Sequence, residues 1–221
     1  MALRIECADG QDRDRAIAAA KAAVRRGDLV VLPTESVYGL ATDAFSERGV
    51  EALRETKGYD EDVPLPVMVG ARSTVAGIAA GISTDAQALI DAFWPGPLTL
   101  ILNQQPTLAW ALPGDAPLSV RMPLHPVALA LLAASGPLVV TTANVPGLPA
   151  PRDVDGALGQ LGESVSVALD AGELVTDGAQ PSTVVDATGA VPRVVRAGAV
   201  TIEELLRVCP SLVSDTGTPD A

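Results

Sequence analysis

Segments with the pattern of helices alternate along this chain with short apolar runs typical of strands, and this alternation limits the fold more than any other feature. The stretch from Asp12 to Arg26 is rich in Ala, opens with acidic residues and closes with basic ones, and Gly27 follows it, which predicts a helix. The apolar run from Asp28 to Leu32 comes next and predicts a buried strand. Such alternation is typical of α/β layered folds.

The same alternation continues almost to the C-terminus. Helices are expected over residues 46–57, 84–94, 126–134, 154–161 and 201–208, and strands over residues 65–69, 98–102, 118–121, 138–141, 167–169, 183–185 and 193–195. Because the late strands are short, we expect a mixed sheet rather than a purely parallel one. We therefore predict a single α/β domain over residues 1–209, with helices flanking a mixed sheet. Residues 210–221 end in small, polar and acidic residues and are expected to form a flexible tail.

Charge and composition narrow the classes of function. The chain has 221 residues, of which 27 are Asp or Glu and 15 are Lys or Arg, so its formal net charge is −12. Such a surface repels phosphate backbones on average, and strong direct binding to nucleic acid is not expected. The N-terminal segment lacks the apolar stretch of a signal peptide, and the longest apolar run is too short to span a bilayer. We expect a cytoplasmic protein without a membrane segment, whose 2 cysteines are reduced.

Common catalytic signatures are missing from the sequence. It has no phosphate-binding loop of the GxxxxGK[ST] type, no GxGxxG, no GxSxG and no HExxH. The only histidine, His125 in the segment RMPLHP, is expected to cap or pack at the start of a helix. We therefore predict neither a protein nucleophile or general base nor a metal site made of protein side chains.

Polar residues gather instead next to the predicted strands. The segment from Pro33 to Ala44 (PTESVYGLATDA) follows the first strand, at the kind of strand end where α/β sheets bind ligands. Arg121 ends an apolar strand, where an unpaired charge would be costly, so it must pair or meet an anion. The remaining clusters are Lys57-Gly58, TTANVPG (141–147), QPSTVVD (180–186) and Arg196-Ala197-Gly198.

These clusters have both a functional and an ordinary structural interpretation. A lysine at a helix C-terminus usually interacts with the helix dipole in solvent, and a polar segment after a strand is often only a turn. Taken together, however, the cations Lys57, Arg121 and Arg196 and the neutral hydroxyls and amides around them suit an anionic ligand that carries phosphates.

The succession of these blocks resembles the YrdC-like family of threonylcarbamoyl-AMP synthases. The blocks are PTESVYGL, a lysine about two turns later, PLPVMV, FWPGPLTLIL, VRMPLHP, TTANVPG, PSTVVD and RAG, and they run from about Asp28 to Val208. The resemblance implies a YrdC-like twisted sheet around a positively charged ligand cavity. It also implies an L-threonylcarbamoyladenylate synthase, a nucleotidyltransferase that makes threonylcarbamoyl-AMP and pyrophosphate from L-threonine, bicarbonate and ATP. That product serves the threonylcarbamoyladenosine modification of tRNA, and partner transferase proteins carry out the transfer.

The resemblance also assigns roles to particular residues. L-threonine is expected to contact Thr34, Arg121, Thr142 and Ser182. Arg121 would hold its carboxylate with two parallel hydrogen bonds. ATP, accompanied by Mg²⁺ that its own phosphates hold, is expected to contact Lys57, Asn144 and Arg196.

Several positions depart from the family pattern. A basic residue is replaced by Tyr59, and other typical residues are replaced by Asp60, Val63, Met68 and Pro117. Loss of a phosphate-binding cation next to acidic residues predicts weak ATP binding. Alternatively, Tyr59 stacks on the adenine or closes the pocket, and another cation such as Arg152 reaches the phosphates.

Two other functions stay open on the sequence alone. The chain could be a diverged member of the same fold that binds nucleotide without turnover or uses another carbamoyl acceptor. It could also be a non-enzymatic RNA-binding module, although the net charge of −12 and the 3% of aromatic residues argue against that function.

Overall fold

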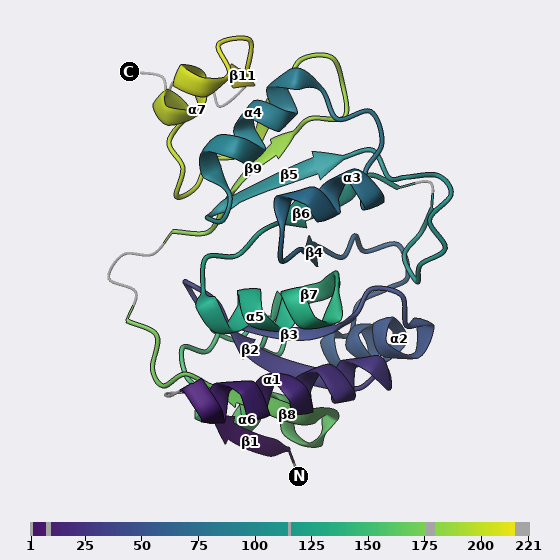
Figure 1. Cartoon of the computed structure of the whole chain (residues 1–221), viewed down its shortest axis with the longest axis vertical. Coiled ribbons are helices and arrows are strands. Elements are labelled where there is room, and N and C mark those ends of the chain that lie inside the picture. Colours follow the sequence, from purple (N-terminus) through teal and green to yellow (C-terminus); the bar gives the residue numbers. More distant parts are fainter. Residues whose placement is uncertain (1, 8–9, 115, 176–179, 215–221) are drawn as a thin grey trace.

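The computed structural model describes residues 2–7, 10–114, 116–175 and 180–214, and its strands form one mixed sheet. The sheet runs from the N-terminal strand at one edge to the last strand at the other (Figure 1). This arrangement confirms the predicted α/β class. In sheet order the strands are β1 (Leu3–Glu6), β8 (Val165–Asp170), β2 (Leu29–Pro33), β3 (Tyr38–Asp43), β7 (Leu138–Thr142), β4 (Val67–Met68), β6 (Leu118–Arg121), β5 (Leu98–Leu102), β9 (Thr183–Asp186), β10 (Arg193–Arg196) and β11 (Val213–Ser214).

Helices cover both faces of the sheet. Two of them, α1 and α5, lie side by side across the half of the sheet that contains β2 and β3 (Figure 1). Strand β2 is buried along its whole length because one face packs under these helices and the other packs into a second core. This explains its unbroken apolar run. The helices are α1 (Gly10–Arg25), α2 (Glu47–Lys57), α3 (Val75–Ile78), α4 (Thr84–Phe93), α5 (Pro126–Ser135), α6 (Val154–Leu161) and α7 (Ile202–Val208), with short 3₁₀ turns at Arg72–Thr74 and Gly162–Ser164.

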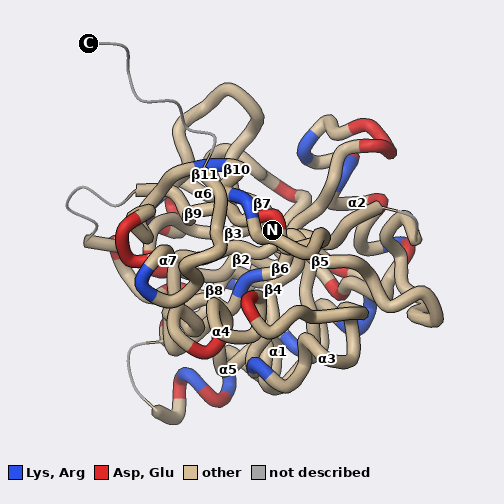
Figure 2. Tube along the Cα trace, turned by 90° about the horizontal axis from the view of Figure 1, so that it is seen from above, with Lys and Arg blue, Asp and Glu red and all other residues tan. Residues whose placement is uncertain are grey.

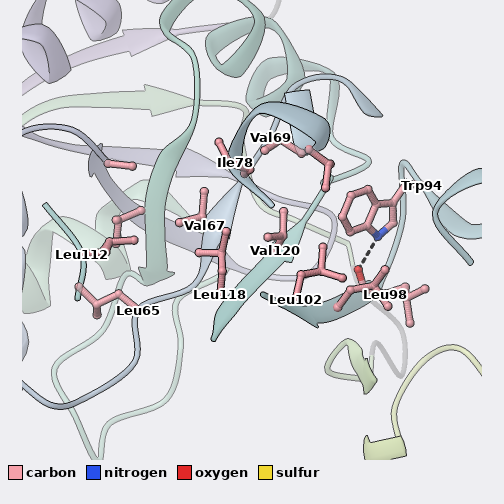
Figure 3. Close-up of a cluster of buried hydrophobic side chains, with 14 of the residues drawn as sticks. Leu65, Val67, Val69, Ile78, Trp94, Leu98, Leu102, Leu112, Leu118 and Val120 are labelled. Atoms are coloured by element: carbon pink, nitrogen blue, oxygen red, sulfur yellow. Dashed lines mark hydrogen bonds between the residues drawn. The ribbon is translucent and has the colours of Figure 1, made fainter. Parts of the chain in front are cut away.

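The larger core is almost wholly aliphatic, as the scarcity of aromatic residues requires. Its largest fully buried side chain, Trp94, packs among Leu and Val side chains of the central strands (Figure 3). The indole Nε1 is buried and donates to the backbone oxygen of Leu98 at 2.7 Å, so the ring carries no unsatisfied polar group into the core.

The helix ends follow the expected chemistry. Ser46, Ser83 and Asp153 each accept a backbone hydrogen bond at the start of a helix. Thr201 and Glu204 form the predicted capping box of α7. At the end of α2, Gly58 adopts φ 58°, a conformation that favours glycine.

The structure differs from the sequence-based expectation in several places, among them helix α3, which was not predicted, and β4, which is shorter than the strand expected over residues 65–69. The segment after β2 does not lead into a helix but turns back as β3, antiparallel to β2. Strand β1 was not predicted; it pairs in parallel with β8. The fold also continues past residue 209, because Leu212 packs into the core and β11 pairs with β10. Residues 215–221 of the expected tail lie outside the described residues.

Candidate functional site

A cavity of about 560 Å³ opens in the middle of the sheet and is the structural candidate for a ligand site. Met68 and Val140 form part of its wall and also pack under α1 and α5, so its floor is continuous with that core. Its lining comes from segments far apart in the sequence, from the turn after β2 to the end of β10. The polar and charged lining residues are Thr34, Ser36, Thr99, Ser119, Arg121, Thr141, Thr142, Gln180, Ser182 and Arg196.

This cavity brings together most of the residues that the sequence marks for ligand contact. All four expected threonine contacts, Thr34, Arg121, Thr142 and Ser182, line it, and so does the expected ATP contact Arg196. They come from five separate blocks of sequence, and the folded sheet places them around one space. What each of them binds stays a prediction.

Arg121 carries its charge at the wall of this cavity. The last residue of β6, it is largely buried, and its Nε donates to the backbone oxygen of Gly96 at 3.2 Å. Its NH2 forms an ion pair with Oε1 of Glu35, in the turn between β2 and β3. Burial, followed by the nearby charge of Arg196, lowers the pKa of Arg121 to about 10, so the guanidinium is protonated at neutral pH.

Arg196 is held against the strand entrance at Ser182. Its NH2 donates to the backbone oxygen of Ser182 at 2.8 Å and to its hydroxyl at 3.1 Å. The same hydroxyl lies 2.9 Å from the hydroxyl of Thr99, so Ser182 links the arginine to the sheet. Gly198 permits this approach, because a Cβ there would lie 2.3 Å from the backbone oxygen of Pro181.

Lys57 lies behind the cavity rather than on its wall. It is only 1% exposed, which contradicts the interpretation as a solvated helix-end lysine. Its Nζ donates to the backbone oxygens of Thr142 and Asn144, and to Oδ1 of Asn144 at 3.1 Å. Burial lowers the pKa of Lys57. In this conformation the lysine fixes the loop after β7, and the ATP contact expected of Lys57 and Asn144 stays a prediction.

Thr34 combines a place on the cavity wall with a structural role. Its hydroxyl donates to the backbone oxygen of Val37 at 2.6 Å, and its backbone N–H donates to the same oxygen at 3.2 Å. These bonds close the turn between β2 and β3. Tyr38, which belongs to the same polar segment, is buried on β3, and its hydroxyl donates to the backbone oxygen of Gly172 at 2.7 Å.

Of the positions that depart from the family pattern, Met68 is the one among the residues that line the cavity. The ring of Tyr59 lies 5.8 Å from Nζ of Lys57 instead of on the cavity wall. Val63 is half-buried and Pro117 is exposed just before β6. The acidic run 60–62 is exposed. Arg152 is also exposed and is not among the residues that line the cavity.

Several lining residues were not predicted as ligand contacts. Thr99 and Ser119 interrupt apolar strands, and Thr99 pairs with Arg121 across β5 and β6. Ser119 stands two residues before Arg121, so strand alternation places them on one face, a signal available in the sequence. The buried hydroxyl of Thr141 has no hydrogen-bond partner in the described structure, which marks it as a group that a ligand or water could satisfy.

The site offers positive charge and hydroxyls but no cluster of metal ligands. Within the described ranges, no group of three or more His, Cys, Asp or Glu side chains could hold a metal ion. His125 caps α5 instead, its Nδ1 accepting from the backbone of Val127 at 3.3 Å, as expected. Elsewhere basic and acidic positions are interspersed along the trace rather than gathered on separate faces (Figure 2). None of the described helices is long and apolar enough to cross a membrane.

Comparison with known proteins places these features in a family. A sequence profile of the Sua5/YciO/YrdC family, described as "Telomere recombination", matches residues 22–198. A protein of Mycobacterium leprae, provisionally named threonylcarbamoyl-AMP synthase, is 49% identical over 211 residues, which cover 93% of this chain and 94% of that protein. The threonylcarbamoyl-AMP synthase of Bacillus subtilis is 33% identical over 94% of this chain.

The fold has a solved counterpart. The crystal structure of Sua5 from Pyrococcus abyssi complexed with L-threonine matches the whole chain with a TM-score of 0.85 and 29% identity. This chain spans 66% of that protein and 60% of the Bacillus subtilis protein, whereas it matches the mycobacterial relative over nearly its full length. The resemblance inferred from the sequence is thereby confirmed, and the chain belongs to the Sua5/YciO/YrdC family.

Proposed function

We propose that this chain is an L-threonylcarbamoyladenylate synthase, which makes threonylcarbamoyl-AMP and pyrophosphate from L-threonine, bicarbonate and ATP. The observation that carries the proposal is the cavity, which gathers Thr34, Arg121, Thr142, Ser182 and Arg196 in a chain whose relatives bear this name. The solved relative that contains L-threonine supports the choice of amino acid. The product would serve the threonylcarbamoyladenosine modification of tRNA.

The chemistry that suits this site is positional and electrostatic. Arg121 binds the carboxylate of threonine, and the hydroxyls of Thr142 and Ser182 orient the amino acid. The unprotonated amine of threonine attacks carbon dioxide and releases a proton to solvent, or condenses with bicarbonate with loss of water, and in either case becomes a carbamate. A carbamate oxygen then attacks the α-phosphorus of ATP, the bond from that phosphorus to the bridging oxygen breaks, and pyrophosphate leaves. Arg196 stabilises the negative charge that develops on the phosphates.

Magnesium is proposed to enter as part of the MgATP substrate. The cavity wall offers hydroxyls and guanidinium groups, and none of its lining residues carries the carboxylate that Mg²⁺ prefers in proteins. The phosphate oxygens would therefore hold the ion, which neutralises part of their charge. The chain's own contribution is to hold the α-phosphate facing the amine end of threonine.

The cellular setting is proposed from the same family membership. We expect the protein to work in the cytoplasm, where tRNA is modified, and to pass its product to tRNA-threonylcarbamoyl-transferase proteins. Direct strong binding to RNA is not part of the proposal, because the net charge is −12 and basic positions are interspersed with acidic ones (Figure 2).

Incubation of the purified protein with MgATP, bicarbonate and single amino acids tests the proposal. L-threonine with bicarbonate is expected to stimulate pyrophosphate release, and mass spectrometry is expected to detect threonylcarbamoyl-AMP. Stimulation by serine or carbamoyl phosphate but not by threonine would instead establish the diverged-paralogue alternative. Neither nucleotide turnover nor nucleotide binding would be expected of the RNA-binding alternative.

A further inference from the structure

Glu35 is an acidic side chain at the candidate site that the proposed chemistry does not use. Its Oε1 forms the ion pair with NH2 of Arg121, and its Oε2 accepts from the backbone N–H of Leu124 at 3.3 Å. The side chain is 19% exposed, so the carboxylate is largely removed from water. A charge held this way requires its partner, because an unpaired buried carboxylate is costly.

The position of Glu35 follows from the turn that carries it. The neighbours on either side, Thr34 and Ser36, both line the cavity. The hydroxyl of Thr34 closes the turn onto the backbone oxygen of Val37 at 2.6 Å, and the backbone N–H of Ser36 lies 3.4 Å from the same hydroxyl. The turn therefore holds the Glu35 carboxylate at the edge of the cavity, where a displaced side chain stays close to any ligand.

The partner of Glu35 is the group that the substrate carboxylate needs. Nε of Arg121 is committed to the backbone oxygen of Gly96 at 3.2 Å, and NH2 holds Glu35. A ligand carboxylate that binds NH2 of Arg121 therefore competes with an internal carboxylate for the same nitrogen. Once displaced, the charge of Glu35 needs a new positive partner, because Arg121 is then neutralised by the ligand.

An α-amino acid supplies that partner. Its ammonium is separated from its carboxylate by a single carbon, so a carboxylate bound to Arg121 places the ammonium beside the position of Glu35. We propose that Glu35 exchanges Arg121 for the substrate ammonium and thereby selects zwitterionic amino acids over simple carboxylic acids. This inference rests on the proposed function, since it requires that an amino acid carboxylate binds Arg121.

A comparison of two ligands in two proteins tests the inference. L-threonine and (R)-3-hydroxybutanoate, which lacks only the amino group, are titrated by calorimetry at pH 7 into the wild type and Glu35→Gln. The wild type is expected to prefer threonine. In Glu35→Gln, hydroxybutanoate binds more tightly because the competing carboxylate is gone, and the preference for threonine falls by about tenfold or more, the scale of one charged hydrogen bond.

Other outcomes overturn the inference, and they distinguish its failure from failure of the proposed function. If Glu35→Gln changes both affinities by the same factor, Glu35 is only a competitor or only a brace for Arg121. A wild type that binds neither ligand contradicts the proposed function and the Glu35 inference together. A wild type that binds threonine, with an unchanged preference in Glu35→Gln, overturns the Glu35 inference alone.

Two control variants guard against indirect effects. Glu51→Gln removes an exposed acidic charge from α2 and is expected to leave the preference unchanged. Glu35→Asp keeps the charge and is expected to retain more of the preference than Glu35→Gln. A thermal unfolding curve for each variant verifies that the protein titrated is folded. A loss of preference in Glu51→Gln equal to that in Glu35→Gln would count against the inference.

Discussion

Arg121 and Lys57 are both buried cations next to the same cavity, yet the structure uses them in opposite ways. Arg121 lines the cavity and pairs with a side chain at its edge, so a ligand can compete for its charge. Nζ of Lys57 donates to the backbone oxygens of Thr142 and Asn144, and Lys57 is not among the residues that line the cavity. Arg121 is therefore available to a ligand, whereas Lys57 stabilises the loop after β7.

The difference lies in the partners of the two side chains. A carboxylate on a turn can move aside when a second carboxylate arrives, so the Arg121–Glu35 pair is replaceable. Backbone oxygens of a loop cannot leave without moving the loop, so the contacts of Lys57 are structural. Two cations that the sequence motifs both assign to ligand binding can thus differ, one lining the cavity and the other bonding to the backbone of a loop.

Removal of the guanidinium should have the largest effect. In Arg121→Ala, the affinity for threonine is expected to fall by about a hundredfold or more, because two charged hydrogen bonds are lost. Arg121→Lys should keep a partial site, since it preserves the charge but not the two-pronged geometry. Calorimetry measures the threonine affinity of both variants. Equal affinity in the wild type and Arg121→Ala would contradict the role of Arg121 as a ligand-binding cation.

Replacement of the buried lysine should act on stability first. In Lys57→Met, the loop oxygens lose their donor, and the free energy of unfolding is expected to fall by about 1–3 kcal/mol, the cost of leaving buried acceptors unsatisfied. Urea denaturation measures this free energy of unfolding, and Lys21→Met on α1 is the matched control. An unchanged unfolding free energy, combined with lost ATP affinity, would make Lys57 a ligand group like Arg121.

A new charge beside the lysine should have a smaller effect. Tyr59→Arg places a cation near Lys57 without contributing to the cavity wall, so ATP affinity is expected to rise by up to about tenfold through charge alone. Threonine affinity should hardly change. If ATP binds more weakly in Tyr59→Arg, and more weakly still in Arg152→Ala, then the tyrosine closes the nucleotide pocket and Arg152 supplies the phosphate contact.

The smallest expected effect is on RNA. Bare tRNA or duplex RNA should show negligible affinity at physiological salt, because Arg121 and Lys57 are both largely buried and the molecule carries a net charge of −12. A fluorescence anisotropy titration is the measurement. Tight binding that weakens steeply with salt would mean that the exposed basic residues, rather than Arg121 and Lys57, dominate the chemistry of this chain.

Much of the fold was predictable from local sequence patterns. Strand β5, strand β6 and helix α6 have the predicted bounds, because each combines a clear periodicity with marked ends. Strand β3 was not predicted, since YGLATD mixes glycine with polar residues and becomes a strand only through pairing with β2 and β7. Strand β1 has a single buried residue, Ile5, and its pairing with β8 spans most of the chain.

The site was predictable as a set of residues but not as a set of contacts. The family motifs identify Thr34, Arg121 and Ser182, and all of them line the cavity. That Glu35 pairs with Arg121, 86 residues later, depends on where the sheet places a turn relative to a strand, which no local pattern encodes. The inward orientation of Lys57 likewise depends on the path of a distant loop.

The sheet order has a consequence for how folding and binding are coupled. The cavity wall takes residues from the turn after β2, from β10 near the end of the fold, and from strands interleaved between them out of chain order. No partly folded chain that lacks one of these segments can present the complete wall, so ligand affinity is a property of the finished domain alone. By mass action, a substrate at one hundred times its dissociation constant would stabilise that domain by about 2.7 kcal/mol. Cellular threonine and ATP would then protect the whole domain from opening and from proteolysis.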